Sequence, residues 1–448
     1  MTIVTKGLIF TSPKIMASAF SPPPTSLFLV SPCVKRVVSK NIMHRGQHRQ
    51  HIDKLSVSNL MAESSRVSTS ERKGFGFKNL TETFWVDVHR AQGRPLNVAL
   101  NAPLCVGSSN LEKVENVAVR IELSNGCVGW GEVAVLPLVT GDQAKALEKV
   151  LEACQFLKES PPMTLNLVLA EIGGILPGPQ FASVRAGVEM ALIDTVANSI
   201  DVPLWRLFGG VSNNLSTAIT IPAVDPTEAS ELASNYCNQG FKTLKLQLGS
   251  NLNEDIEVFQ AIQAVHPHCS FILDANERYT SKEAFQVLAK LTEMGVTPIL
   301  LEQPVHRDDW EGLRYINNVA RDVYGVNVIA DESCRTLIDV KKVVNENLAN
   351  VINIKLAKFG VLGTLEIVEF ARKSGLNLMF DSMVETRLAT GFAGHLAAGL
   401  GCFKYVNLDM PFLLPEDPVV GGYEVSGDIY KFINTRGQGG FLEWNSVS

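Results

Sequence analysis

The sequence predicts an α/β protein in which a parallel (β/α)7β barrel follows an N-terminal α+β capping domain. From Ser216 onward, short apolar runs alternate with amphipathic helical patterns, as in a barrel whose strands are joined by helices. Three consecutive runs end in acidic residues, Asp274, Glu302 and Asp331, separated by 302 − 274 = 28 and 331 − 302 = 29 residues. This spacing is about the length of one strand-plus-helix unit, so the three carboxylates are expected together at the barrel mouth.

Eight runs are predicted to be the barrel strands: STAITIPAV, FKTLKLQLG, SFILDAN, ILLEQPV, NVIADES, VINIKLAK, LNLMFDSM and KYVNLDM. An open, doubly wound sheet is the alternative arrangement. It is disfavoured because no Gly-rich phosphate loop follows any of these runs and because polar residues recur at nearly every strand end. In a barrel, such residues line the active site.

The remaining chain divides by composition. Residues 53–82 are polar and are interpreted as a disordered linker. Residues 83–210 combine β-type runs with helical patterns and form the capping domain, and 211–415 form the barrel that carries the active site. Residues 416–448 have strand character and are expected to pack back on the capping domain.

The N-terminal segment 1–52 is interpreted as a chloroplast transit peptide. It contains no acidic residue and seven Lys and Arg, and it is rich in Ser and Pro. Three consecutive prolines at 22–24 argue against the amphipathic helix of a mitochondrial signal. Its removal leaves a net charge of −6 − 7 = −13. A disordered tail without a targeting role is the alternative.

The overall composition excludes several partners. The 448-residue chain has 46% hydrophobic residues and a net charge of −6, so it lacks a basic surface for nucleic acid. No apolar run approaches the roughly 20 residues of a membrane span, so no membrane partner is expected. Eight cysteines without a CxxC pair suit a reducing compartment.

Asp274, Glu302 and Asp331 predict a magnesium site. They offer hard anionic oxygens, which suit Mg²⁺ better than Zn²⁺ in the absence of His or Cys. The alternative is that each carboxylate only caps the helix that follows its strand. Three acids at matching strand ends favour the metal.

Two lysines are placed to act on a substrate carboxylate held there. Lys245, which shares a strand face with Gln247, lies on the second predicted strand, and Lys355 ends the sixth. These strands flank the acidic arc from opposite sides. A metal would stabilise the enediolate formed when a lysine removes the α-proton, and a lysine with a lowered pKa is a suitable base. A structural ion pair is the alternative role for Lys355.

The motifs together resemble a known family. GWGE (129–132) lies in the capping domain, VRAGVEMALIDTVANSIDVPLWRLFGG at the domain junction, and LDAN, LEQP, ADES and NIKLAK in the barrel. With these motifs in this order the chain resembles the enolase superfamily, its muconate-lactonising subgroup, and in particular dipeptide epimerases of plant type. The resemblance covers nearly everything after the linker.

The resemblance implies an enolase-like barrel in which Asp274, Glu302 and Asp331 hold Mg²⁺ and Lys355 is a base. It also implies that a capping-domain loop near Asn101–Asn110 closes over the substrate. The expected substrate is a small carboxylate, a dipeptide or an acyl-amino acid. We also expect identical chains to assemble as a homo-oligomer.

The sequence departs from the family pattern at three strand ends. Gln247 occupies the place of the second, catalytic lysine of a Lys-x-Lys motif, and Lys245 matches only the first. The Asp-x-Asp that grips a substrate ammonium group reads Asn407-Leu408-Asp409 here, and Asp381 stands where relatives have a small residue. We expect Lys245 to serve with Lys355 in catalysis, and Gln247, Asp381, Asn407 and Asp409 to contact the substrate.

Three functions stay open from the sequence, because a Gln amide cannot transfer a proton. The first is an epimerase in which another group replaces the missing lysine. The second is a one-base lyase or cycloisomerase that relies on Lys355. The third is a non-catalytic paralog that binds a small acid or a sister subunit. Cys334 and His395 are interpreted as structural.

Overall fold

The computed structural model describes residues 76–106, 109–135, 141–249 and 251–447. The predicted transit peptide at 1–52 and the predicted linker up to residue 75 lie outside the described residues.

The last part of the predicted linker is a helix, so the linker prediction is wrong over residues 76–82. Helix α2 (Gly76–Thr83) buries Phe77 and Leu80, which lie on one face three residues apart. The ring of Phe77 packs against Phe208, with centroids 5.4 Å apart. Two buried apolar side chains are enough to pack this short helix against the core. The residues around them are polar, so the composition of the segment does not indicate a helix.

The eight predicted barrel strands are all present in the described chain and form one parallel sheet ordered from β14 to β7. The Ala218 N–H donates to the Val406 carbonyl at 2.8 Å, so the two end strands meet beside each other and the barrel is nearly closed. The strands are β7 (Ile219–Ile221), β8 (Thr243–Gln247), β9 (Ser270–Asp274), β10 (Leu300–Glu302), β11 (Asn327–Ala330), β12 (Val351–Ile354), β13 (Asn377–Asp381) and β14 (Tyr405–Asn407).

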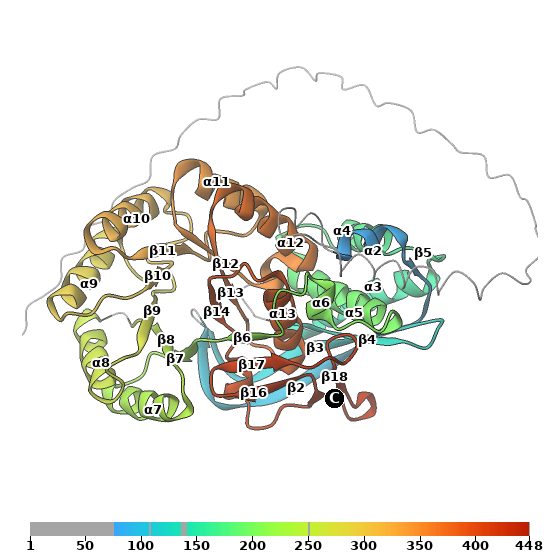
Figure 1. Cartoon of the computed structure of the whole chain (residues 1–448), viewed down its shortest axis with the longest axis horizontal. Coiled ribbons are helices and arrows are strands. Elements are labelled where there is room, and N and C mark those ends of the chain that lie inside the picture. Colours follow the sequence, from blue (N-terminus) through green and yellow to red (C-terminus); the bar gives the residue numbers. More distant parts are fainter. Residues whose placement is uncertain (1–75, 107–108, 136–140, 250, 448) are drawn as a thin grey trace, which may run out of the picture. The chain divides into compact units, whose positions relative to one another are not determined.

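A helix follows each barrel strand up to β13, which confirms the predicted (β/α)7β order in the described chain (Figure 1). Most of these helices begin at a polar cap; Thr280 and Thr336, for example, both form capping boxes. The helices are α7 (Pro226–Gln239), α8 (Leu252–Val265), α9 (Ser281–Glu293), α10 (Trp310–Tyr324), α11 (Leu337–Glu346), α12 (Leu356–Ser374) and α13 (Arg387–Leu400).

The capping domain pairs an antiparallel sheet with helices. Its main sheet contains β2 (Val88–Val106), β3 (Ser109–Leu123) and β4 (Val128–Val133), and its helices are α3 (Gln143–Glu159), α4 (Leu165–Ile175) and α5 (Ala182–Ser199). Short elements complete this half of the chain: β1 (Trp85–Val86), β5 (Met163–Thr164), η1 (Pro179–Phe181), α6 (Leu204–Leu207) and β6 (Asn214–Ser216).

The glycines of the GWGE motif allow close packing of β4 on α5. A Cβ at Gly131 would lie 1.9 Å from the Gly187 carbonyl oxygen, and one at Gly129 would lie 2.2 Å from the Thr195 nitrogen. Only glycine permits backbones to approach this closely. The motif is therefore structural at these two positions.

The C-terminal segment contacts the capping domain. The Arg94 guanidinium donates to the Trp444 carbonyl, and the rings of Trp130 and Trp444 have centroids 5.7 Å apart. After the short helix η2 (Met410–Leu413), which follows the last barrel strand, the segment contains β15 (Val419–Gly421), β16 (Tyr423–Ser426), β17 (Ile429–Phe432), β18 (Gly440–Leu442) and η3 (Trp444–Ser446).

No single helix in the described ranges is both long enough and apolar enough to span a membrane. Leu165–Ile175 and Pro179–Ser199 satisfy that test only together, as a pair bent by 112°, and most of the apolar side chains of α5 are buried in the protein core.

His395 is a buried, neutral imidazole on α13. Its Nδ1 accepts the Trp205 backbone N–H at 3.2 Å, and its Nε2 donates to the Gln438 carbonyl at 3.1 Å. Burial lowers the pKa of His395 from 6.5 to about 3. A second proton on Nδ1 would point at the Trp205 N–H, so the fold retains the neutral ring.

We expect acidification from about pH 6.5 toward pH 3 to destabilise the protein through His395. Over this window the unfolded chain binds a proton that the folded chain excludes, so stability falls as the pH falls. The loss reaches up to about 4 kcal/mol at the acidic end, at about 1.4 kcal/mol per pH unit. Urea denaturation at about pH 7 and pH 5 measures it.

A His395→Gln variant provides the control, since it removes the titration. Its stability should change less between the two pH values than that of the parent, and equal changes would refute the role of His395. Asp194 and Glu189 act with the opposite sign, because burial raises the pKa of each carboxyl group to about 7. Their contribution to the stability of the folded protein falls as the pH rises from about 4 to 7. This change is the same in the parent and in the variant.

Candidate active site

The three predicted metal ligands lie at the carboxyl ends of adjacent strands. Register pairs Gln247 with Asp274 and Asp274 with Glu302, so these three residues lie at one level of the barrel. Asp331 follows β11, two residues beyond Ile329, which pairs with Glu302. All three carboxylates are buried. The structure therefore brings the predicted acidic arc together.

The ammonium group of Lys245 lies among the carboxylates at the mouth. Its Nζ is 3.0 Å from Asp274 Oδ2, 2.9 Å from Glu302 Oε2 and 2.9 Å from Asp381 Oδ2. Lys245 points from a level below Gln247, because it pairs with Thr220 and Ile272 in the strand register. Its long stem thus carries the charge up to the arc. In the described structure its directed hydrogen bond goes to Asp381.

Asp331 is held by two other lysines. Lys355 Nζ is 2.7 Å from Asp331 Oδ2, and Lys358 Nζ is 2.5 Å from Oδ1 and 2.7 Å from the Asp331 carbonyl oxygen. Lys355 Nζ is also 3.5 Å from Asp381 Oδ2. One oxygen of Asp381 therefore lies between the two lysines that approach from opposite sides of the barrel mouth.

Asp381 is fixed by two side-chain amides. Asn353 Nδ2 donates to its Oδ2 at 3.0 Å and Asn407 Nδ2 donates to its Oδ1 at 3.1 Å. Burial would raise the pKa of Asp381, but Lys245 and Lys355 bring it below its ordinary value. This carboxylate is therefore anionic in the folded protein.

The polar side chains at the end of β14 form hydrogen bonds with each other and with β7. Asp409 Oδ2 accepts the Thr220 N–H at 2.7 Å, and its Oδ1 accepts from Asn407 Nδ2 at 3.2 Å. Burial raises the pKa of Asp409. Asn407 Oδ1 is buried without a hydrogen-bond partner, so it offers an acceptor to a ligand.

The cluster raises the pKa of two of its members for different reasons. Burial, reinforced by the negative charge of Asp274, raises the pKa of Glu302 well above its ordinary value. Burial would lower the pKa of Lys355, but Asp331 and Asp381 raise it above its ordinary value. These two carboxylates thus stabilise the ammonium form of Lys355.

Lys358, Asn353 and Glu332 also belong to the site, and the sequence interpretation missed them. Lys358 follows Lys355 by three residues, a spacing that places both on one side of the first helical turn after β12. Asn353 precedes Lys355 by two and so shares its strand face. Glu332 carries a buried, unpartnered Oε2, and burial beside Asp331 raises the pKa of Glu332 to about 8.

The donor set fits magnesium in its chemistry. Among the described residues, no group of three or more His, Cys, Asp or Glu side chains is spaced to hold a metal ion, and lysine ammonium groups lie among the carboxylates. Carboxylate oxygens are the ligands that Mg²⁺ prefers. Glu302 Oε2 is buried and, although 2.9 Å from Lys245 Nζ, makes no directed hydrogen bond.

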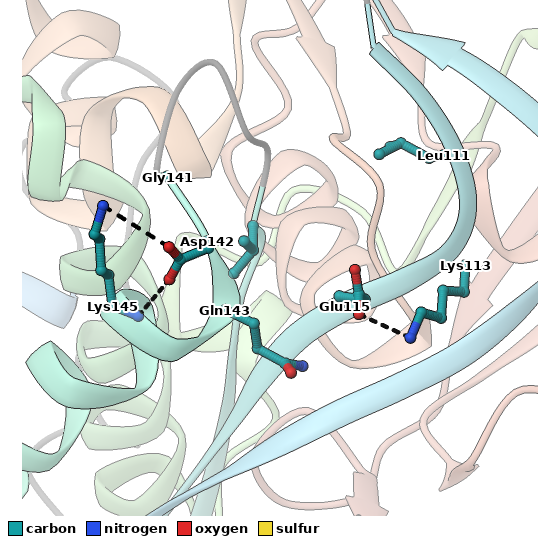
Figure 2. A pocket seen from close by; sticks show the side chains of 8 residues that line it. Leu111, Lys113, Glu115, Gly141, Asp142, Gln143 and Lys145 are labelled. Carbon is teal, nitrogen blue, oxygen red and sulfur yellow. Dashed lines mark hydrogen bonds and ion pairs between the residues drawn. The ribbon is translucent and has the colours of Figure 1, made fainter.

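The capping domain reaches the barrel near the end of β14. Asn101 Nδ2 donates to the Phe412 carbonyl at 3.2 Å, which brings β2 against the segment after the last strand. A separate cavity of about 380 Å³ lies within the capping domain between β3 and the start of α3, beside Glu115, Asp142 and Lys145 (Figure 2). None of the predicted site residues lines it.

This barrel, with its acidic arc and opposed lysines, defines a member of the enolase superfamily. Residues 90–209 match the mandelate racemase/muconate lactonizing enzyme N-terminal domain, and residues 228–439 match the enolase C-terminal domain-like family. The chain therefore belongs to the mandelate racemase/muconate lactonizing enzyme family.

Named relatives are dipeptide epimerases. The chain is 62% identical over 397 residues to the L-Ala-D/L-amino acid epimerase of Populus trichocarpa, covering 88% of this chain and 94% of the relative. It is 33% identical over 358 residues to the L-Ala-D/L-Glu epimerase of Bacillus subtilis, covering 78% and 95% of the two chains.

The structure is also similar to solved structures of dipeptide epimerases. The substrate-liganded B. subtilis L-Ala-D/L-Glu epimerase superposes with a TM-score of 0.75 at 31% identity, over 80% of this chain and 99% of that one. The Enterococcus faecalis dipeptide epimerase complexed with Mg and L-Leu-L-Tyr gives a TM-score of 0.72 at 28% identity, over 79% and 99%.

Proposed function

We propose that this protein is a magnesium-dependent epimerase that removes and returns the α-proton of a dipeptide. The observation that supports this most directly is a pair of lysines, the buried Lys245 and the partly buried Lys355, which approach Asp381 from opposite sides of the carboxylate arc. The names of the related epimerases support the reaction and the substrate class.

Asp274, Glu302 and Asp331 would hold Mg²⁺, which would supply positive charge to the substrate carboxylate and make its α-proton more acidic. Lys355 would hold or accept that proton at Nζ on one side. Asp331 and Asp381 raise the pKa of Lys355 above its ordinary value. A cation beside Asp331 would offset that effect and would make Lys355 a better proton acceptor.

Lys245 would deliver a proton from the other side in place of the missing second lysine. Gln247 lies above it on the same strand face, level with Asp274, and can orient a substrate amide but not move a proton. Asn407 offers its unpartnered Oδ1 to a donor of the substrate, such as an ammonium group.

Exchange of the α-proton tests this proposal. The full chain with Mg²⁺ in D₂O should incorporate deuterium into L-Ala-containing dipeptides and give both configurations at the exchanged carbon, as measured by NMR. Absence of exchange with every dipeptide and acyl-amino acid tried, together with Mg²⁺-dependent stabilisation, would instead support a non-catalytic binding protein.

Gln247 favours a second candidate, a one-base lyase or cycloisomerase. Such an enzyme needs Lys355 but no opposing acid/base, so the substitution at Gln247 would cost it nothing. It would produce an unsaturated or cyclised product in place of an epimer. NMR of the product separates the two candidates, because a cyclised isomer has the same mass as an epimer but a different bonding pattern.

We also propose import into the chloroplast, supported by the composition of residues 1–52. A fluorescent protein carrying this segment should accumulate in chloroplasts, and a cytosolic distribution would contradict the proposal.

A further inference from the structure

Helix α12 is broken one turn after Lys355. Gly360 has φ 75° and ψ 173°, which is not a helical conformation, so α12 consists of a first turn, residues 356–359, and a longer helix that begins after Gly360. The Lys358 N–H donates to the Lys355 carbonyl at 3.0 Å and closes the first turn. The position of this turn is therefore not set by continuous helical hydrogen bonds with the rest of α12.

A buried carboxylate from the domain junction caps the longer helix. The first N–H groups of a helix have no partner within it. Here Glu189 Oε2 accepts the N–H of Val361 at 2.5 Å and that of Leu362 at 3.3 Å. Glu189 lies on α5, within the junction motif VRAGVEMALIDTVANS, and is 1% exposed. The proposed chemistry gives this residue no role.

The break in α12 and the carboxylate fit each other. A Cβ at Gly360 would lie 2.9 Å from Glu189 Oε2 and 3.2 Å from Arg185 Nε, and the positive φ also favours glycine here. Arg185 faces the other carboxylate oxygen, with Nε 3.9 Å from Oε1, and its Nη1 donates to the Leu176 carbonyl at 2.7 Å. Glu189 is therefore held on the α5 side and meets α12 at the one point where that helix is interrupted.

The cap requires an oxygen at this position more than it requires a charge. Burial raises the pKa of Glu189 to about 7, while Arg185 and the N–H groups of Val361 and Leu362 oppose this rise. The carboxylate and the neutral acid both present an oxygen that accepts hydrogen bonds. Side-chain length therefore matters more than ionisation for the contact with α12.

We propose that Glu189 is a positioning residue for Lys355: by capping the longer part of α12 it holds the far end of the turn 356–359, whose near end is Lys355. The inference rests on the proposed function, because it takes Lys355 as the group that accepts the α-proton. A displacement of about 1 Å at a reacting group can cost about 10²-fold in rate. Loss of the cap should therefore slow proton transfer at Lys355 without removing any group that touches the substrate.

The two epimers of a dipeptide give a readout for each lysine. Lys355 faces the α-proton of one epimer and Lys245 that of the other, so deuterium incorporation with retention of configuration reports the two lysines separately. Lys355→Ala identifies the epimer that Lys355 serves. Glu189→Ala should slow the exchange of that epimer by about tenfold to a hundredfold and that of the other epimer by less than about threefold. Its KM should be unchanged.

Two conservative variants separate side-chain length from charge. Glu189→Gln keeps the length and an acceptor oxygen, so its exchange should stay within about threefold of the parent for both epimers. Glu189→Asp keeps the charge but is one methylene shorter, so it should reproduce the selective loss. Glu189→Asp also carries the test if Glu189→Ala does not fold.

Asp194→Ala is the matched control. Asp194 lies on the same helix, is also 1% exposed and also accepts two backbone N–H groups, those of Trp130 at 3.0 Å and Gln438 at 2.7 Å, neither of which is on α12. Asp194→Ala should lower the melting temperature as Glu189→Ala does. The ratio of the exchange rates of the two epimers should stay at its parent value.

Amide hydrogen exchange gives a readout that does not depend on activity. The peptide 356–362 should exchange faster in Glu189→Asp than in the parent and in Asp194→Ala. Unchanged exchange of this peptide, or equal slowing of both epimers, would overturn the role of Glu189. If the parent with Mg²⁺ exchanges no α-proton at all, the proposed function fails, and the peptide still decides whether Glu189 holds the turn after Lys355.

Discussion

Replacing Lys355 by alanine is expected to slow α-proton exchange by about 10²–10⁴-fold or more, the usual contribution of a positioned acid or base. Lys355 Nζ lies at the mouth between Asp331 and Asp381, where it can meet a substrate carbon above the arc. NMR measurement of exchange in D₂O at saturating Mg²⁺ gives the rate.

Lys358→Ala is the matched control for this prediction. It removes the same charge from the same carboxylate, since Lys358 also pairs with Asp331. If proton transfer is the role of Lys355, a small added amine should partly restore exchange in Lys355→Ala and not in Lys358→Ala. Equal losses without rescue in either variant would show that Lys355 acts only as an ion-pair partner.

Replacing Glu132 by alanine is expected to lower the free energy of unfolding by about 3–5 kcal/mol, since each buried donor left without an acceptor costs about 1–3 kcal/mol. Glu132, in the GWGE motif, joins the capping domain to the start of α13. Its carboxylate accepts hydrogen bonds from Asn116 Nδ2, from the N–H and hydroxyl of Thr386, and from the Ala389 N–H. The substitution leaves these buried donors without an acceptor.

Urea denaturation of Glu132→Ala against Glu424→Ala measures this effect. Glu424 is exposed and pairs only with Lys431 in the described structure, so its loss should stay within about 0.5 kcal/mol. Similar midpoints for the two variants would contradict the role of Glu132. Because Thr386 follows Asp381 by five residues, the Glu132 variant should also weaken substrate binding.

Local pattern was sufficient for the barrel and for the level of the acidic arc. Alternation within a strand fixes which side chains face inward, and parallel register then aligns residues such as Gln247, Asp274 and Glu302. The local pattern did not predict helix α2. Its buried residues Phe77 and Leu80 pack against partners far along the chain, such as Phe208.

The sequence by itself determined that Asp274, Glu302 and Asp331 end adjacent strands, with Lys245 and Lys355 on the flanking strands. Only the tertiary structure decided what those lysines contact. Lys245 bonds to Asp381, 136 residues away, and Lys358 shares Asp331 with Lys355. The face on which a strand side chain lies follows from a two-residue period, whereas the contacts of a long side chain depend on neighbours that only closure of the barrel brings together.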